Sequence, residues 1–195
     1  KKTKPMEKYD VLEPDYFYHI FNRGNNKETL FKEHANYVYF LKLVKRHLCR
    51  IADIYAYCLM KNHFHLLIKI KSESEIKAIP KNKTLKNLSQ PLSNLFNAYV
   101  KAFNNRYNRE GSLFRRKYKR KRILKDDYLI NLITYIHLNP VRHKADFKYK
   151  SYPYSSFKSI MSSGQTDLKR DEVFEIFDNK ENFLTVHENK FKKYL

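Results

Sequence analysis

Two histidines, His63 and His65, interrupt the otherwise apolar stretch MKNHFHLLIKI at residues 60–70. Side chains at positions i and i+2 of a β-strand point to the same face, whereas the intervening Phe64 points to the other face. Two imidazoles arranged in this way can bind one divalent metal ion together. The alternative is a pair of histidines on a half-buried sheet face, each held by a local hydrogen bond.

A second group of polar side chains lies in TYIHLNP at residues 134–140. On an α-helix, Tyr135 and Asn139 share one face, about 40° apart, and Tyr128 falls on the same stripe two turns earlier. His137 points nearly the opposite way. The simpler interpretation is a tyrosine packed on a sheet and an asparagine that caps a helix before Pro140.

The hydrophobic pattern predicts the elements that carry these groups. Residues 16–24 are typical of a strand, and about 33–49 of an amphipathic helix. Two further strands, IADIYAYCLM and HFHLLIKI, are joined by a tight turn in which Asn62 suits a positive φ. A polar loop over residues 71–91 leads into a second helix that ends before Gly111, and residues 111–124 are typical of a basic strand.

A third helix begins at Asp126, and Pro140 is expected to stop it. The order strand, helix, strand, strand, helix, strand predicts an α+β, ferredoxin-like (RRM-like) βαββαβ fold. Its antiparallel sheet has helices on one face, plus an extra tyrosine-bearing helix. We expect a domain over residues 1–163 and a C-terminal helical tail over residues 164–195.

The charge of the chain indicates a polyanionic partner. It has 40 Lys+Arg against 20 Asp+Glu, a net charge of +20. This surplus predicts salt-sensitive binding of nucleic acid rather than a membrane, since no cationic amphipathic helix with a broad apolar face is apparent. No apolar run approaches the roughly 18 residues of a membrane span. Without a signal peptide or metal-type spacing of Cys49 and Cys58, the sequence predicts a cytoplasmic protein.

Five segments, in the same order, resemble the single-tyrosine transposases of the HUH superfamily, above all the REP-associated tyrosine transposases and their insertion-sequence relatives. They are YHIFNRGNNKETLF, CLMKNHFHLLI, NRYNREGSLFRRKYK, TYIHLNPVRHKA and YPYSSF, within residues 16–160. The resemblance implies that His63 and His65 are metal ligands and that Asn139 is the third. It also implies that Tyr135 is the nucleophile. Lys61 departs from the proline found in many relatives, and touches no expected ligand.

The implied activity is metal-dependent cleavage and rejoining of single-stranded DNA through a 5′-phosphotyrosine intermediate, with hairpin DNA as the substrate. A phenol is a poor nucleophile at its usual pKa near 10, and a divalent ion can act as a Lewis acid on the phosphate. Availability favours Mg²⁺, with Mn²⁺ as the alternative. Because a phosphotyrosine conserves the energy of the phosphodiester, no ATP site is needed, and the sequence contains no P-loop.

The candidate DNA-binding residues are mainly cations around one aromatic ring, a pattern suited to single strands. They are Arg115, Arg116, Lys117, Tyr118, Lys119, Arg120, Lys121 and Arg122, with Arg23 and Arg142 as further candidates. The alternative for this run is a solvated basic face.

Three alternatives stay open from the sequence. The chain could be a non-catalytic or domesticated nucleic-acid-binding protein with a ferredoxin-like fold, in which tyrosines of YFYHIF and IYAYC stack on bases. Tyr128 is the second candidate for the nucleophile. Some relatives act as monomers and others assemble each active site from two chains, so a homodimer is an alternative to a monomer.

Overall fold

A computed structural model describes residues 10–77, 87–146 and 148–195 of the chain. Its centre is one four-stranded sheet with the strand order β2-β3-β1-β4, in which every neighbouring pair is antiparallel. The strands are β1 (Phe17–Arg23), β2 (Ala52–Met60), β3 (His63–Ile70) and β4 (Lys119–Ile123). This order is that of the predicted ferredoxin-like fold, which is therefore confirmed.

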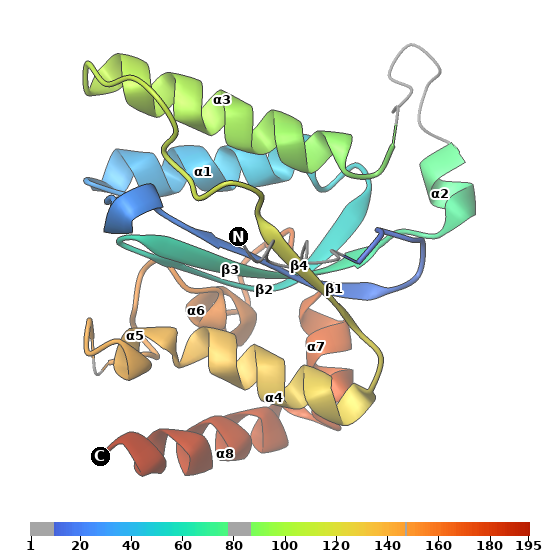
Figure 1. The fold of residues 1–195 in the computed structure, drawn as a ribbon. Coiled ribbons are helices and arrows are strands. Elements are labelled where there is room, and N and C mark those ends of the chain that lie inside the picture. The colour runs from blue at the N-terminus through green and yellow to red at the C-terminus, as the bar shows by residue number, and fades with distance from the viewer. Residues whose placement is uncertain (1–9, 78–86, 147) are drawn as a thin grey trace, which may run out of the picture.

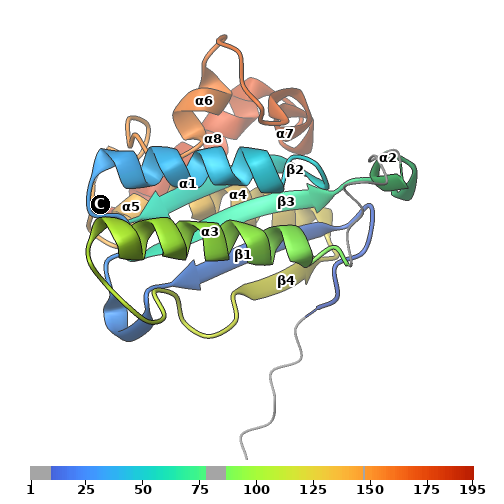
Figure 2. The same cartoon turned by 90° about the horizontal axis from the view of Figure 1, so that it is seen from above.

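Helices cover both faces of the sheet (Figure 1). On one face lie α1 (His34–His47) and α3 (Gln90–Arg106), side by side along the strands (Figure 2). The other face carries α4 (Asp126–His137), α5 (Asn139–Arg142), α6 (Phe157–Met161), α7 (Arg170–Ile176) and α8 (Lys180–Phe191). Short helical turns are η1 (Asn25–Lys27), α2 (Glu73–Lys77) and η3 (Lys192–Tyr194). No helix in the described ranges is long and apolar enough to cross a membrane.

Because helices cover both faces of the sheet, its tyrosines can be checked against the alternative in which they stack on nucleic-acid bases. Tyr18 and Tyr55, two tyrosines of the segments considered for stacking, are buried. Tyr57 is half-buried. These rings belong to the packed layers under the helices, so they do not form the open aromatic surface that stacking on a sheet requires.

Strand β3 divides its side chains between two cores. Phe64, Leu66 and Ile68 are buried on the side of α1 and α3, where they join one hydrophobic cluster. Leu67 belongs to the second cluster, which lies between the sheet and α4. His63 and His65 share the face of Leu67, because side chains alternate along a strand. The apolar face therefore anchors the strand, and the histidines face α4.

The turn between β2 and β3 differs from the sequence prediction, because neither Lys61 nor Asn62 has a positive φ. The carbonyls of this turn are instead held by distant parts of the chain. The carbonyl oxygen of Lys61 accepts from the Leu30 and Phe31 amides at 2.8 and 3.1 Å, and that of Asn62 accepts from the Gly24 amide at 2.9 Å. These bonds hold the tight turn in place without the positive φ that residues of such turns usually adopt.

Two further boundaries are corrected. Of the basic strand expected over residues 111–124, only β4 is a regular strand; Phe114 forms an isolated bridge with Gly24. Pro140 does not simply stop the third helix: α4 ends at His137 and Pro140 lies in the first turn of α5. Proline is tolerated there because the first amide groups of a helix have no partner within it.

The segments flanking this framework are partly as expected. The polar loop over residues 71–91 contains the short helix α2, and its residues 78–86 lie outside the described residues. The predicted helical tail contains α7 and α8. Val173 of α7, Phe177 just after it and Phe183 of α8 join the hydrophobic cluster that packs against α4. The domain boundary at residue 163 stays a prediction.

A buried polar network fixes α4 from its far side. His137 Nδ1 lies 2.9 Å from His187 Nε2 on α8, and His137 Nε2 lies 2.8 Å from Ser156 Oγ. The Tyr57 amide of β2 donates to the same hydroxyl at 2.9 Å. Burial lowers the pKa of His187 to about 4 and holds that of His137 well below its usual range. Both imidazoles are thus neutral and tie α4 to α8 and to the sheet.

Acid is expected to destabilise the protein through these two histidines. Below about pH 6.5 the unfolded chain binds protons that the folded chain excludes, so stability is full above that pH and is lost as the pH falls toward 4. Each histidine contributes up to about 1.4 kcal/mol per pH unit. Urea unfolding across about pH 7.5 to 5 measures the slope. His187→Phe should reduce this slope, whereas His34→Gln, at an exposed position at the start of α1, should leave it unchanged. Equal slopes in wild type and His187→Phe would contradict the assignment.

Candidate active site

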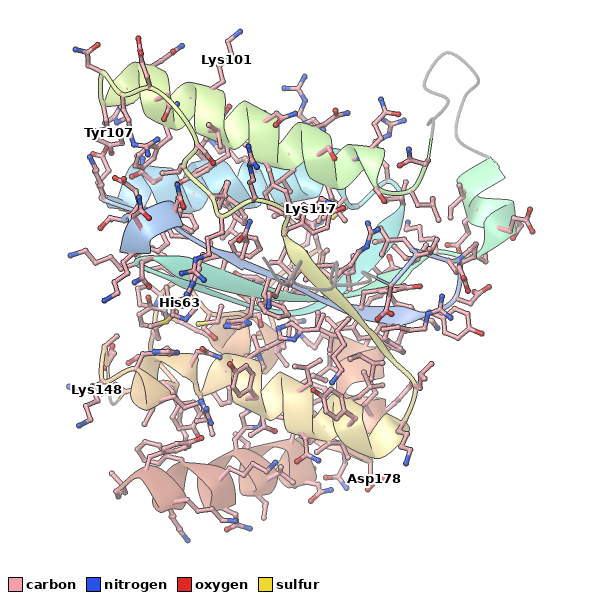
Figure 3. All side chains as sticks on the ribbon, in the orientation of Figure 1. His63, Lys101, Tyr107, Lys117, Lys148 and Asp178 are labelled. Atoms are coloured by element: carbon pink, nitrogen blue, oxygen red, sulfur yellow. The ribbon has the colours of Figure 1, made fainter. Side chains whose placement is uncertain are left out.

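His63 lies between the sheet and the α4–α5 segment (Figure 3), and His65 lines a cleft with Tyr135, Leu138 and Arg142 of that segment. The ring centroids of His63 and His65 are 5.4 Å apart. His65 is 7% exposed, whereas His63 is half-buried. The shared face expected from the alternation of β3 is thus present.

The hydrogen bonds of His63 and Asn139 leave two buried acceptor atoms unused. His63 Nδ1 lies 2.8 Å from Asn62 Oδ1, an acceptor, so the proton is on Nδ1 and Nε2 carries a lone pair. Asn139 Nδ2 donates to the Tyr135 carbonyl at 2.8 Å. His63 Nε2 and Asn139 Oδ1 are both buried and find no hydrogen-bond partner within the described ranges. Two buried lone pairs without a donor are costly unless a cation satisfies them.

The pKa shifts keep these imidazoles neutral. Burial, together with the nearby charge of His143, lowers the pKa of His63 to about 4, and the adjacent Asn139 side chain opposes this shift. Burial, reinforced by His19, holds the pKa of His65 well below its usual range. Neutral imidazole is the form that binds metal, so both rings are ready for a ligand role at neutral pH.

The donor set fits a divalent ion only if an amide is included. No group of three His, Cys, Asp or Glu side chains in the described part of the chain is arranged to hold a metal. Two imidazoles with the amide oxygen of Asn139 supply three neutral ligands, and waters or phosphate oxygens would complete the coordination. The unused lone pairs of His63 and Asn139 are therefore in agreement with the predicted ligand set.

Tyr135 enters the same site from α4. Its half-buried ring has its centroid 5.4 Å from that of His65, and the Arg142 guanidinium lies 4.7 Å over its face. The ring lines a cleft of about 500 Å³ together with His65, Tyr128 and Lys121. Tyr128, the second nucleophile candidate, is on this stripe as expected. Of the two tyrosines, Tyr135 is the one with ring contacts to the histidines.

The basic strand divides its cations between the two faces of the sheet. Lys121 pairs with His19 and lines the tyrosine cleft, and Lys119 pairs with Phe21 on the same face. Arg120 and Arg122 point to the other face. Arg120 donates to Ser89 and Tyr118, and Arg122 forms an ion pair with Glu13 at 2.7 Å. The run is therefore not one continuous track.

The remaining DNA-binding candidates are not all gathered at the site. Arg23 pairs with His63 across β1 and β3, and the Arg115 amide donates to the Arg23 carbonyl at 2.9 Å. Arg116 and Lys117 are exposed in the segment that leads into β4. The expected stacking ring, Tyr118, is instead half-buried, with its centroid 5.1 Å from that of Phe96.

The sequence interpretation missed His19 as a residue of the site and considered His143 only as a weaker DNA-contact candidate next to Arg142. His19 Nε2 lies 2.8 Å from His65 Nδ1, and both rings are buried. The ring of His143 lies 4.5 Å from that of His63. The signal for His19 was its alternation with Phe17 and Phe21, but the pairing of β1 with β3 was needed to bring it to His65. His143 follows Asn139 by one helical turn, which was the available signal.

Comparison with known proteins decides the family. A family model described as "Transposase IS200 like" matches residues 14–139, a segment that contains the two histidines, Tyr135 and Asn139. The chain belongs to the IS200-like transposase family. Membership of this family indicates the general activity class of DNA strand cleavage and transfer.

Solved structures support the fold of this IS200-like transposase. One, described as a REP-associated tyrosine transposase bound to a REP hairpin, aligns with a TM-score of 0.62 over 84% of this chain and 88% of that chain. The sequence identity is 13%, so the likeness establishes the shared fold. No curated protein matches the sequence significantly.

The amide of Asn139 should decide metal affinity. We expect Asn139→Ala to weaken Mn²⁺ binding at least about 10- to 100-fold. A loss of this size is typical when a residue that only hydrogen-bonds to a metal ligand is changed, and loss of a ligand should cost no less. Asn139→Asp keeps an oxygen and adds a charge, so it should bind as tightly as wild type or more tightly. Mn²⁺ titration followed by electron paramagnetic resonance measures both.

Asn104→Ala is a matched control for this experiment. Asn104 lies near the end of α3 and donates to the Gly111 carbonyl at 3.0 Å, as Asn139 does to Tyr135. It should leave Mn²⁺ affinity unchanged. Wild-type affinity in Asn139→Ala would remove this residue from the ligand set.

Proposed function

We propose that this IS200-like transposase is a metal-dependent endonuclease and strand transferase for single-stranded DNA, with Tyr135 as its nucleophile. The observation that carries the proposal is one arrangement within a single chain. His63 Nε2 and Asn139 Oδ1 present unused lone pairs in a buried site, and the Tyr135 ring contacts the neighbouring His65.

The reaction is an in-line displacement at phosphorus. The Tyr135 oxygen attacks the scissile phosphate and loses its proton, the bond from phosphorus to the 3′-oxygen breaks, and the departing 3′-oxygen takes up a proton. The products are a 5′-phosphotyrosine and a free 3′-OH strand. A 3′-OH can then attack the phosphotyrosine and restore both the phosphodiester and the phenol, so joining needs no ATP.

The residues around Tyr135 assist the attack electrostatically. The Arg142 guanidinium over the ring favours negative charge as it develops on the phenol oxygen. Lys121, in the same cleft, is placed to hold a DNA phosphate. A divalent ion at His63, His65 and Asn139 would act as a Lewis acid and orient the phosphate, and neutral ligands would leave its charge undiminished. We propose Mg²⁺, with Mn²⁺ as the alternative.

Hairpin-containing single-stranded DNA is the proposed substrate. The net charge of +20 favours nucleic acid, and the similar structure described above is that of a transposase bound to a REP hairpin. Because Tyr135 and the two histidines come from one chain, we propose that the tyrosine acts in cis. Homodimer formation is then not required for cleavage.

Covalent capture tests the nucleophile. We expect the wild-type protein, incubated with labelled hairpin oligonucleotides and Mg²⁺ or Mn²⁺, to give a protein–DNA band on a denaturing gel. Tyr135→Phe should abolish this band because it lacks the attacking oxygen, and Tyr128→Phe should retain it. His63→Ala should lose it together with metal binding.

Other outcomes of this assay are equally informative. Loss of the band in Tyr128→Phe alone would move the nucleophile to Tyr128. Equal, tight DNA binding in all these proteins, with no covalent band for any hairpin in a randomised library, would favour the non-catalytic binding protein.

The divided basic strand generates a separate prediction for DNA affinity. Lys121→Ala should weaken binding of single-stranded DNA and reduce the slope of log affinity against log salt by about 0.7. Arg120→Ala should change that slope less, because its guanidinium already donates to Ser89 and Tyr118. Fluorescence anisotropy at several salt concentrations measures both, and a larger slope change in Arg120→Ala would contradict the assignment of faces.

A further inference from the structure

His19 lies against a metal-ligand candidate from the neighbouring strand. In the register of β1 and β3, Phe21 faces His65 and His19 faces Leu67, so His19 and His65 are diagonal neighbours on one face of the sheet. His19 Nε2 and His65 Nδ1 are 2.8 Å apart, with the two rings inclined by 26°. Each side chain is 7% exposed.

This contact constrains which nitrogen of His65 is free. Its Nδ1 is occupied by His19, so Nε2 is the atom left for a metal. A neutral imidazole carries one proton, and a ligating nitrogen must not carry it. If Nε2 ligates, the proton is therefore on Nδ1 and is donated to His19 Nε2.

The other histidine is held in the same way. His63 Nδ1 donates to Asn62 Oδ1, which leaves its Nε2 unprotonated and without a partner in the described structure. A hydrogen bond from the nitrogen opposite the metal is the usual device that fixes a ligand's tautomer and ring orientation. Asn62 supplies this acceptor for His63, and His19 is the corresponding group for His65.

The surroundings of His19 hold its ring in place. It lies on β1, an inner strand of the sheet, and stacks on Phe21 with a centroid distance of 4.5 Å. The Tyr135 ring approaches its edge at 6.4 Å. Because Phe21 and Tyr135 restrict the movement of the His19 ring, this ring can hold the His65 ring in one orientation.

We propose that His19 is a positioning residue that accepts a hydrogen bond from His65 Nδ1 and so keeps His65 Nε2 unprotonated and aimed into the site. The role rests on the proposed metal-dependent function. His19 itself contacts neither the ion nor the DNA in this role. Its loss is expected to weaken metal binding about 10- to 100-fold, the usual effect of an outer-shell partner.

The first test is the tautomer of His65 in the metal-free protein. Long-range ¹H–¹⁵N correlation spectra distinguish protonated Nδ1 from protonated Nε2, and His65→Gln identifies the His65 signals. Wild type should carry the proton on Nδ1. In His19→Leu this preference should be lost, whereas His19→Gln, whose amide oxygen can accept the same hydrogen bond, should keep it. A wild-type His65 protonated on Nε2 would overturn the proposal.

The second test is Mn²⁺ affinity of the full chain without DNA. His19→Leu should bind about 10- to 100-fold more weakly, and His19→Gln should recover most of the loss. Leu67→Val is the matched control, because Leu67 faces His19 in the same layer and offers no hydrogen bond. It should leave Mn²⁺ affinity unchanged even if its melting temperature falls.

The two proposals fail in distinguishable ways. If wild type and His63→Ala bind Mn²⁺ equally weakly, the metal site is wrong, and the role of His19 falls with it. If wild type binds Mn²⁺ through His63 but His19→Leu binds equally well, only the positioning role is wrong. If His19→Leu does not fold, His19→Gln provides the test. A folded His19→Gln protein that has lost Mn²⁺ affinity and carries the His65 proton on Nε2 would also overturn the positioning role.

Discussion

The site depends on two buried acceptor atoms, one on His63 and one on Asn139, that no group among the described residues satisfies. Burial keeps His63 and His65 unprotonated, as the lowered pKa values indicate. The same burial leaves His63 Nε2 without a hydrogen-bond donor, and Asn139 Oδ1 is likewise buried with no donor among the described residues. A folded protein tolerates such an unsatisfied pair at a cost, and sites of this kind are commonly functional. Cation binding would remove that cost.

The rest of the fold keeps this arrangement rigid. The apolar face of β3 is packed under α1 and α3, so the strand that carries the histidines is fixed by one core while its other face serves the site. Helix α4 is held in turn by His137, whose two nitrogens contact α8 and Ser156. Tyr135 and Asn139 project from the remaining side of that segment. Both halves of the site thus stand on regular elements, which gives more precise geometry than loops do.

The sequence predicted the parts of this arrangement that follow from local periodicity. Alternation placed His63 and His65 on one face, and helical spacing placed Tyr135, Tyr128 and Asn139 on one stripe. Contacts that depend on strand register were not accessible, which is why the contact of His19 with His65 was missed. The basic run suffered from the same limit. The alternation of its side chains between the two faces follows from the sequence, but their partners do not. Arg120 donates to Ser89 at the N-terminus of α3, and Tyr118 packs on Phe96 of α3.

The choice of asparagine at position 139 follows from the two ends of its side chain. The carbonyls of the last helical turn lack intrahelical donors, and Asn139 Nδ2 supplies one to Tyr135. That bond uses only Nδ2, and the buried Oδ1 has no hydrogen-bond partner among the described residues. An aspartate has no donor for the carbonyl and would reduce the charge of a bound ion, and an alanine has neither atom. One amide therefore couples the backbone that carries the nucleophile to the site proposed to hold the ion. The spacing of four residues between Tyr135 and Asn139 is what permits this coupling.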